Sequence, residues 1–373
     1  MIAGRGRPSV VMVADQLHQR VSGGVGVYTS AALVALAQLL PTVHDVSLRT
    51  FASAPRGGGP QIFPFLGLEH QQSRLPQPFA QRAWDRGLET PKQWDLLYSF
   101  SMGGPKPRRN ADRCVYNVHD AIFLSHPEFF PPRGRRWHQK TLQFIRDQSG
   151  TVVTVSEASK SALAYFGIAT ERIVVIGPGA DHLGPGDAIG ARALLAQLGV
   201  QGDYILTAST VEPRKNLVRL FEAFSLFREE ATDPVNLVVV GPHGWGDELA
   251  VPGGAVATGY VSSAILSALY AAARCFVYVP LIEGYGLPVL EAQSQCLPVV
   301  ASPVPAADGS TIVVDPMDPG AIANGMRRAF YEDALRARLV TEGLLRTAEM
   351  TWLRTGERHL ELFRRILLGG VSE

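Results

Sequence analysis

Residues 275–301 read CFVYVPLIEGYGLPVLEAQSQCLPVVA, and this stretch contains one complete strand–helix–strand repeat. Residues 275–279 form an apolar run of the kind that is buried on both faces of a parallel sheet. A glycine-spaced loop follows, and Pro288 is suited to the first turn of a helix that we expect over residues 288–295. A second apolar run at 298–301 completes the repeat. The order strand, helix, strand predicts a βαβ unit in a parallel α/β sheet.

The same alternation extends in both directions from this repeat. Residues 177–186 are rich in Gly and Pro, which is typical of a linker. We therefore predict two doubly wound, Rossmann-like domains, over residues 1–183 and 184–350, and a last helix within 351–373. The expected strands cover residues 9–14, 46–52, 94–100, 113–118, 151–155, 173–176, 204–208, 236–240, 275–279, 298–301 and 311–314. The expected helices cover residues 29–40, 216–227, 265–273, 288–295, 319–331 and 353–368.

Composition excludes several classes of protein. The chain has 373 residues, of which 46% are hydrophobic, enough for two buried cores. Its formal net charge of +1 leaves no basic excess for a row of phosphates, so we expect no nucleic-acid partner. Three scattered cysteines fit a reducing compartment without disulfides or structural zinc. We find no leader and no apolar run of about 18 residues, and expect a cytoplasmic protein.

Two cations follow the strand expected at 204–208. They stand in the run Glu212-Pro213-Arg214-Lys215-Asn216, where the next helix begins. A helix N-terminus already favours an anion, and Arg214 and Lys215 would add charge-assisted hydrogen bonds worth roughly 1.5–3 kcal/mol each. The alternative is a solvated basic pair. Cations at a helix start oppose the helix dipole, so an anion site is the favoured interpretation.

Two carboxylates follow the strand at 275–279, with seven residues between them. Glu283 lies in the loop and Glu291 about one turn into the next helix, and we expect both to face the open edge of the sheet. Gly284 and Gly286 allow the backbone to approach a ligand closely. Carboxylates accept hydrogen bonds, which suits a ligand rich in hydroxyl groups. The alternative is that Glu291 only complements the helix dipole.

A glycine cluster, Ser22-Gly23-Gly24-Val25-Gly26, follows the first expected strand. It is not a dinucleotide-binding fingerprint, because Thr29 stands where the third glycine belongs, and no Lys follows as in a P-loop. A tight turn without a ligand is the alternative to a binding loop. His119 and Asp120 end another strand, where they would orient a substrate or where Asp120 would cap a helix.

A basic stretch with one aromatic residue, PPRGRRWHQK, covers residues 131–140. An apolar continuation follows Trp137, so the stretch fits a surface helix. Its basic face would either be solvated or meet anionic lipid or a diphosphate-linked acceptor. A solvated face is the favoured interpretation.

Taken together, these motifs resemble the retaining glycosyltransferases of the GT-B fold, the large family four that includes many bacterial mannosyltransferases. The resemblance covers nearly the whole chain. It is carried by EGYGLPVLE from Glu283 to Glu291 and EPRKNL from Glu212 to Leu217. The GG-x-G loop, HD at 119–120, VSEASK from Val155 and W-x4-E from Trp352 support it.

The resemblance implies a role for each matching residue. Arg214 and Lys215 would hold the diphosphate of a nucleotide-sugar donor, and Glu283 would bond the donor sugar beside the amides of Gly284, Gly286 and Leu287. Glu291 would bond the ribose hydroxyls. Gly23 and Gly24 would approach the phosphates, and His119 would lie beside the anomeric carbon. The two domains would face each other across a cleft, and the last helix would return to the first domain.

The same resemblance implies a reaction without a metal ion or other cofactor. Arg214, Lys215 and helix N-termini would stabilise the leaving diphosphate, and no D-x-D triplet is present to hold a metal. EPRKN is typical of enzymes that use GDP-mannose, which makes mannose the expected sugar. One departure concerns residues 303–310, where the family's longer loop is shortened. This puts the shape of the cleft edge in question.

The expected partners are a nucleotide sugar and a glycan or polyprenyl-diphosphate-linked acceptor, with a peripheral contact at the inner membrane face as a further hypothesis. Two other functions stay open on the sequence alone. A nucleotide-sugar epimerase of the same fold would convert the donor without an acceptor. A non-catalytic relative would bind the nucleotide sugar and a partner protein.

Overall fold

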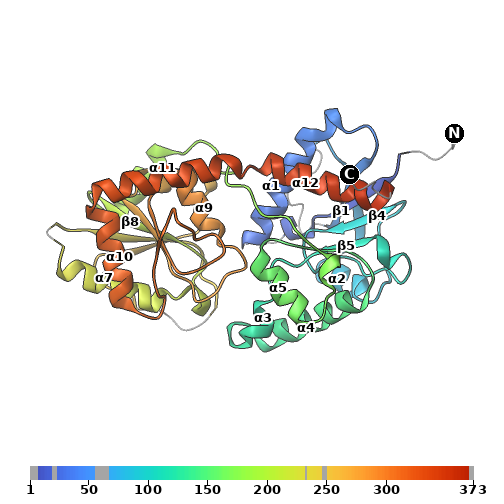
Figure 1. The fold of residues 1–373 in the computed structure, drawn as a ribbon, viewed down its shortest axis with the longest axis horizontal. Helices are drawn as coiled ribbons and strands as arrows, with labels where there is room; N and C mark the ends of the chain where they lie inside the picture. The colour runs from blue at the N-terminus through green and yellow to red at the C-terminus, as the bar shows by residue number, and fades with distance from the viewer. Residues whose placement is uncertain (1–6, 19–22, 55–66, 232, 246–249, 369–373) are drawn as a thin grey trace. The chain divides into compact units, whose positions relative to one another are not determined.

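The computed structural model describes residues 7–18, 23–54, 67–231, 233–245 and 250–368. The chain divides into two compact units. The first contains Met1–Pro178 and Trp352–Glu373, and the second contains Gly179–Thr351. The sequence placed the two boundaries after residues 183 and 350. Each unit is built around one parallel sheet with helices packed on it (Figure 1).

The sheet of the first unit has the order β3-β2-β1-β4-β5-β6-β7, and all of its pairs are parallel. The chain therefore runs outward from β1 to one edge and then returns to build the other half, as in a doubly wound sheet. Its central strands are buried throughout and mostly apolar, as expected where helices cover both faces of a sheet. The strands are β1 (Ser9–Val13), β2 (Ser47–Ala54), β3 (Glu69–Pro76), β4 (Leu96–Ser99), β5 (Cys114–Asn117), β6 (Val152–Thr154) and β7 (Ile173–Val175).

The helices of the first unit come from both ends of the chain. The C-terminal helix α12 packs on α1, and the two lie side by side in Figure 1. Gly356 permits this approach, since a Cβ atom there would lie 3.0 Å from the Cβ of Ala35. Beneath them, the Tyr98 hydroxyl donates to Nε2 of buried His359 over 2.8 Å. The helices are α1 (Gly23–Leu39), α2 (Phe79–Trp84), α3 (Ile122–Ser125), α4 (Pro132–Asp147), α5 (Glu157–Tyr165) and α12 (Trp352–Leu368).

The second unit repeats the plan with the sheet order β10-β9-β8-β11-β12-β13. Its six strands are again parallel, and β8 and β11 are neighbours at the centre. The strands are β8 (Tyr204–Ala208), β9 (Asn236–Val240), β10 (Ala255–Gly259), β11 (Cys275–Tyr278), β12 (Val299–Ala301) and β13 (Ile312–Val313). The helices are α6 (Ala188–Gln197), α7 (Leu217–Glu229), α8 (Ser263–Ala272), α9 (Leu287–Ser294), α10 (Pro319–Tyr331) and α11 (Asp333–Glu349).

The α/β class, the two sheets and the repeat from β11 to β12 agree with the sequence prediction. The expected start of α1 was wrong, because the helix begins at Gly23 and not near residue 29. The sequence also missed β3, which reads EHQQSRLP and has few apolar residues. This strand lies at the edge of the sheet and is largely exposed, so no apolar pattern marks it.

The expectation that no segment is long and apolar enough for a membrane span needs one correction. Residues 23–42 form a helical segment with a mean hydropathy of 1.5, and 44% of its most apolar window is buried. Its helix α1 is covered by α12, and Ala32, Leu33 and Leu36 are fully buried. These apolar residues serve the packing of the first unit.

Candidate functional site

Two loops of the second unit meet where the central strands β8 and β11 end. The first carries Arg214 and Lys215 in a short 3-10 turn, Pro213–Lys215. Asn216 follows in the left-handed conformation, with φ of 58°. Its buried amide donates to the carbonyl oxygens of Val279, at 3.0 Å, and Pro316, at 2.8 Å. Asn216 therefore ties the cationic loop to the end of β11, which explains why Asn follows the two cations.

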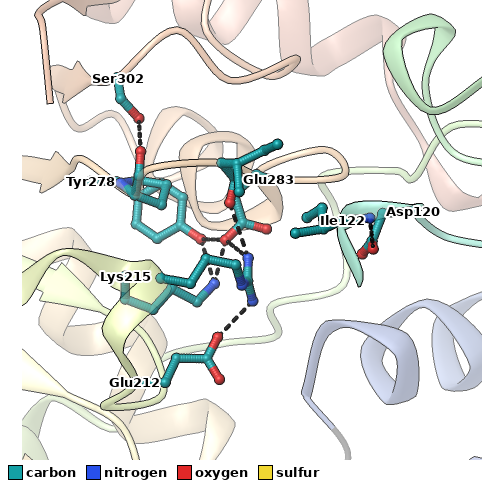
Figure 2. A network of polar contacts seen from close by, with 10 residues as sticks. Asp120, Ile122, Glu212, Lys215, Tyr278, Glu283 and Ser302 are labelled. Carbon is teal, nitrogen blue, oxygen red and sulfur yellow. Dashed lines mark hydrogen bonds and ion pairs between the residues drawn. The ribbon is translucent and has the colours of Figure 1, made fainter. Parts of the chain in front are cut away.

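Three donors converge on one oxygen of Glu283 (Figure 2). Arg214 Nη1 donates to Oε1 over 2.6 Å, the Tyr278 hydroxyl donates over 2.8 Å, and Lys215 Nζ makes a short contact. Lys215 also donates to the Tyr278 hydroxyl over 2.9 Å. The other carboxylate oxygen, Oε2, receives no hydrogen bond from the part of the chain that the structure describes. One oxygen thus fixes the carboxylate and the second is left to accept from a ligand.

The charges of this cluster keep Glu283 ionised. Burial by itself would raise the pKa of the carboxyl, but Lys215 and Arg214 outweigh it and hold that pKa at about 2. Burial, and after it the charge of Glu283, raises the pKa of Tyr278 well above its usual value. Tyr278 therefore stays protonated and donates. Glu212 completes the set by accepting from Arg214 Nη2 over 2.6 Å, which balances two cations with two carboxylates.

Glu291 lies on α9 but has other partners. Its Oε1 contacts His182 Nε2 at 3.0 Å, and its Oε2 accepts from the Tyr270 hydroxyl over 2.9 Å. Its side chain is only 9% exposed, which is more enclosed than the sequence suggested. No contact joins it to Arg214 or Lys215 within the described residues. It is still near enough to Tyr278 for its charge to contribute to the raised pKa of that hydroxyl.

The loop between the two carboxylates is supported from behind. Gly286 has φ of 103°, and a Cβ atom there would lie 3.0 Å from Val304 Cγ2, so the position requires glycine. The Ala306 amide donates to the Tyr285 carbonyl oxygen over 2.8 Å. Segment 303–310, which the sequence analysis expects to be shorter than in the family, therefore packs directly against the loop of Gly284, Gly286 and Leu287.

Gly23 and Gly24 form the first turn of α1 in the first unit. Gly23 has φ of 53°, and no atom lies within 4 Å of a Cβ built at either position. The first turn of a helix has free backbone N–H groups, so this glycine pair leaves them open to an anion. Ser22, which the sequence grouped with them, lies outside the described residues.

His119 and Asp120 border a cavity of about 390 Å³ in the first unit. His119 Nε2 donates to the Phe100 carbonyl oxygen over 2.9 Å, which requires the proton on Nε2. Burial lowers the pKa of His119, although Phe100 and Asp120 oppose this, so the imidazole is neutral. Asp120 Oδ1 accepts from the Ile122 amide over 3.0 Å at the start of α3 (Figure 2). Asp120 is not the N-cap residue of α3, which is Ala121, but it bonds to the first amide of that helix and also lines the cavity.

The cavity lies where β1, β4 and β5 end. Asp15, Gln81 and Asn117 add polar groups to its wall, and Trp137 and Phe123 add aromatic ones. Trp137, which the sequence analysis grouped with the basic residues of 131–140, is not part of their exposed face. The indole Nε1 donates to Asp85 Oδ2 over 3.2 Å, because Trp137 lies on the inner face of α4.

Sequence reasoning missed several of these residues. Tyr278 and Tyr270 read as core aromatic residues in apolar segments, and His182 as part of a linker. Asp15 carried a weak signal, since it follows the first strand as His119 follows the fifth. Within the described residues there is no group of three or more His, Cys, Asp or Glu that could hold a metal ion.

Comparison with known families matches most of the chain. A family described as "Glycosyltransferase Family 4" matches residues 22–182, and one described as "Glycosyl transferases group 1" matches residues 202–332. The chain is 33% identical over 257 residues to the O-antigen chain mannosyltransferase B of Escherichia coli, which is 65% of this chain and 67% of that protein. It is 26% identical over 273 residues to the serotype-specific mannosyltransferase WbdA of Escherichia coli, 68% of this chain but only 33% of that longer protein.

Other relatives carry a different name. The D-inositol 3-phosphate glycosyltransferase of Nocardia farcinica (strain IFM 10152) is 26% identical over 397 residues, covering 92% of this chain and 84% of that protein. Among solved structures, Anabaena Alr3699/HepE in complex with UDP and glucose superposes with a TM-score of 0.71 at 17% identity, over 95% of this chain and 99% of that chain. WaaG, a glycosyltransferase involved in lipopolysaccharide biosynthesis, superposes with a TM-score of 0.69 at 16% identity, over 97% of this chain and 100% of that chain.

Proposed function

Because the chain belongs to glycosyltransferase family 4 and has the α/β GT-B fold, we propose that it transfers mannose from GDP-mannose to a glycan acceptor, with retention of configuration and without a metal ion. The observation that carries the proposal is the convergence of Arg214, Lys215 and Tyr278 on one oxygen of Glu283. The similarity to two mannosyltransferases supports the choice of sugar.

Lys215 and Arg214 would bind the donor diphosphate. The Lys215 ammonium has three hydrogens, and Glu283 and Tyr278 accept two of them. The third has no acceptor within the described part of the chain and is available to a phosphate oxygen. Both cations are held by carboxylates before the donor arrives. They therefore need no large reorganisation to stabilise the charge that grows on the leaving diphosphate.

The two carboxylates would bind the rest of the donor. Glu283 Oε2 is ionised and would accept from hydroxyl groups of the transferred sugar, beside the amides of Gly284, Gly286 and Leu287. A carboxylate has about four acceptor positions, and His182 and Tyr270 occupy two of those on Glu291. The remaining two would accept the ribose hydroxyls.

The first unit would supply the acceptor side. Neutral His119 would lie beside the anomeric carbon, with Nδ1 as an acceptor because Nε2 carries the proton. The N–H groups at Gly23 and Gly24 would approach the phosphates. We assign no side-chain nucleophile, since the proposed reaction is a same-face attack in which the leaving phosphate helps to deprotonate the acceptor hydroxyl.

The full chain is expected to transfer or hydrolyse sugar from GDP-mannose at an undiminished rate in excess EDTA, because cationic side chains replace the metal. The measurement is turnover of GDP-mannose, with UDP-glucose as the comparison donor and calorimetry with GDP and UDP to report binding. Strict dependence on added Mn²⁺ would contradict the mechanism. Conversion of the donor sugar without an acceptor would indicate an epimerase, and binding without turnover across an acceptor panel would indicate a non-catalytic relative.

Helix α4 offers a place for the proposed peripheral contact with the inner membrane face. Arg133, Arg136 and Lys140 are exposed and follow one another at the spacing of a single helix face. Each basic residue near an anionic surface contributes roughly 1 kcal/mol.

Replacing Arg133, Arg136 and Lys140 together with Gln is expected to weaken binding to phosphatidylglycerol vesicles by on the order of a hundredfold. Sedimentation with vesicles measures the effect, and zwitterionic vesicles provide the matched control. Equal sedimentation of the variant and the unaltered protein would remove α4 from the proposal.

A further inference from the structure

The charged, polar and aromatic residues that line the cavity of the first unit suit some kinds of acceptor better than others. We propose that it binds an uncharged sugar ring, the end of a neutral glycan, and excludes sugars or polyols that carry a phosphate. This inference rests on the proposed glycosyl transfer and narrows its acceptor. It is drawn from the charges, hydrogen-bonding groups and aromatic rings of the described residues around the cavity.

The wall contains negative charge without positive charge to balance it. Asp15 and Asp120 line the cavity, whereas no Lys or Arg does so among the residues that the structure describes. A phosphate group in proteins is met by Arg, Lys or a cluster of N–H donors, because its charge must be compensated. Apart from the N-terminus of α1, whose Val25 lines the cavity and whose N–H groups we assign to the donor phosphates, a phosphate here would face two carboxylates. Hydroxyl groups, which donate to carboxylates, suit the same positions.

A buried cation of the first unit, Lys106, is already neutralised. Lys106 is 7% exposed and its Nζ lies 2.5 Å from Asp85 Oδ1, with a second bond of 3.2 Å to the Thr141 hydroxyl. It does not line the cavity. Lys106 therefore compensates Asp85 and does not provide a charge for an acceptor phosphate.

Asp85 in turn holds two parts of the cavity wall. Its Oδ2 accepts from the Trp137 indole, and its Oδ1 accepts from the Gln81 amide over 3.1 Å. Both side chains line the cavity. An aromatic face and an amide are thereby held in place before a ligand binds, which is the arrangement that reduces the ordering cost of binding.

The aromatic residues of the cavity wall contact one another and form a cluster. Phe123, Phe130, Trp137 and His138 all line it, and Trp137 meets His138 edge to face with ring centroids 4.9 Å apart. A sugar ring has one face made largely of C–H groups, which is apolar and packs on an aromatic surface, while its hydroxyl edges require polar partners. A wall that contains both an aromatic cluster and carboxylate and amide groups matches those two requirements.

One buried side-chain amide at the cavity wall is left without a well-formed hydrogen bond among the described residues. Asn117 is 0% exposed, and neither its Nδ2 nor its Oδ1 has a hydrogen-bond partner in that part of the chain. The Asn117 side chain lies near the hydroxyls of Tyr28 and Tyr98 and acts to lower their pKa values, but Tyr28 donates to the Ile176 carbonyl oxygen and Tyr98 to His359. An unsatisfied buried amide is costly, so a ligand with neutral donors and acceptors would stabilise it.

The test measures binding to the full chain without a donor, by saturation-transfer NMR and calorimetry. The neutral probes are methyl α-mannoside, methyl α-glucoside and α-mannobiose, and the charged probes are mannose 6-phosphate and inositol 1-phosphate. We expect the neutral probes to bind at least about tenfold more tightly than their charged counterparts. Equal or tighter binding of the phosphates, or no binding of any neutral probe, would overturn the proposal.

Two substitutions locate the effect. Asp120→Asn is expected to weaken the neutral probes and to reduce their advantage over the phosphates, whereas Asp112→Asn, the same change at an exposed position that does not line the cavity, should leave both unchanged. Trp137→Ala should abolish saturation transfer to the C–H protons, and Trp137→Phe should restore part of it. A preference that is insensitive to Asp120 and Trp137 would contradict this site.

These measurements involve no nucleotide. Failure to turn over GDP-mannose would therefore count against the proposed reaction, and loss of the neutral-sugar preference against the cavity alone. The distinction matters because this chain is similar both to mannosyltransferases and to enzymes named for D-inositol 3-phosphate. The cavity favours the kind of acceptor without a phosphate.

Discussion

Glu283→Gln is expected to lower kcat with GDP-mannose by at least about a hundredfold, the equivalent of roughly 2.7 kcal/mol in the transition state. The amide cannot balance two cations, and it replaces an ionised acceptor for sugar hydroxyls with a neutral group. Lys215 and Arg214 would lose a charged partner and attract the diphosphate more strongly, so binding of GDP should be unchanged or tighter. Separate measurements of kcat, of KM and of the Kd for GDP check this split.

Two matched variants test whether the expected effect is specific to Glu283. Glu212→Gln also removes a carboxylate from Arg214, but Glu212 has no contact with Lys215 or Tyr278 among its described hydrogen bonds, so a smaller loss is expected. Glu291→Gln should raise the donor KM more than it lowers kcat, because the proposed partner is the ribose. If Glu283→Gln keeps full activity, or weakens GDP binding as much as it slows transfer, the proposed role of Glu283 is wrong.

Asp85→Ala is expected to reduce the free energy of unfolding by about 3 kcal/mol or more, because it leaves Lys106 charged and buried without a partner. The Trp137 and Gln81 donors lose their acceptor at the same time. Urea unfolding followed by circular dichroism measures the loss. Removing both charges in Lys106→Met with Asp85→Leu should recover much of the stability, since a buried ion pair is replaceable by packed apolar side chains.

The pH dependence of the same variant has a definite sign. Burial lowers the pKa of Lys106, and the contacts with Asp85 oppose that shift, so the pKa should fall further when Asp85 is removed. The unfolded chain then binds more protons than the folded one, and stability rises with pH. The loss in free energy of unfolding caused by Asp85→Ala should therefore become smaller between about pH 8 and 10. A loss that is constant or grows over this range would show that Lys106 is not the cause.

The central elements of the fold and much of the proposed donor site could be predicted from the sequence, for one physical reason. In parallel sheets the carboxyl ends of neighbouring strands lie at one edge, so loops that follow β8 and β11 must approach each other. That rule brings Arg214, Lys215 and Glu283 together although about 68 residues separate Lys215 from Glu283. It gives no indication that Glu291 would bond to His182 and Tyr270.

The cavity of the first unit was much less predictable. Its wall depends on Asp85 meeting Lys106 and Trp137, which lie 21 and 52 residues away along the chain. No motif or periodicity connects the three positions. Trp137 in particular was grouped with the basic residues beside it, because the sequence does not show which face of α4 turns inward.

The sequence predicts that segment 303–310 is shortened and puts the shape of the site edge there in question. The structure shows how this segment is held in place. Arg346 Nη1 donates to the Ala306 carbonyl oxygen over 2.5 Å, and Arg346 Nε lies 2.9 Å from Asp308. Helix α11 thus holds the segment against the loop of Gly286. The shorter loop is well packed, and it supports the proposed donor site from behind.

The position of α12 has a consequence for how the protein is made. A ribosome completes residues 7–178 long before residues 352–368, yet α1 acquires its covering helix and Tyr98 its bond to His359 only from that late segment. Domains ordinarily fold in the order of synthesis. Here the half of the protein that emerges first should be the last to reach its native state, with the apolar face of α1 exposed to chaperones while translation continues.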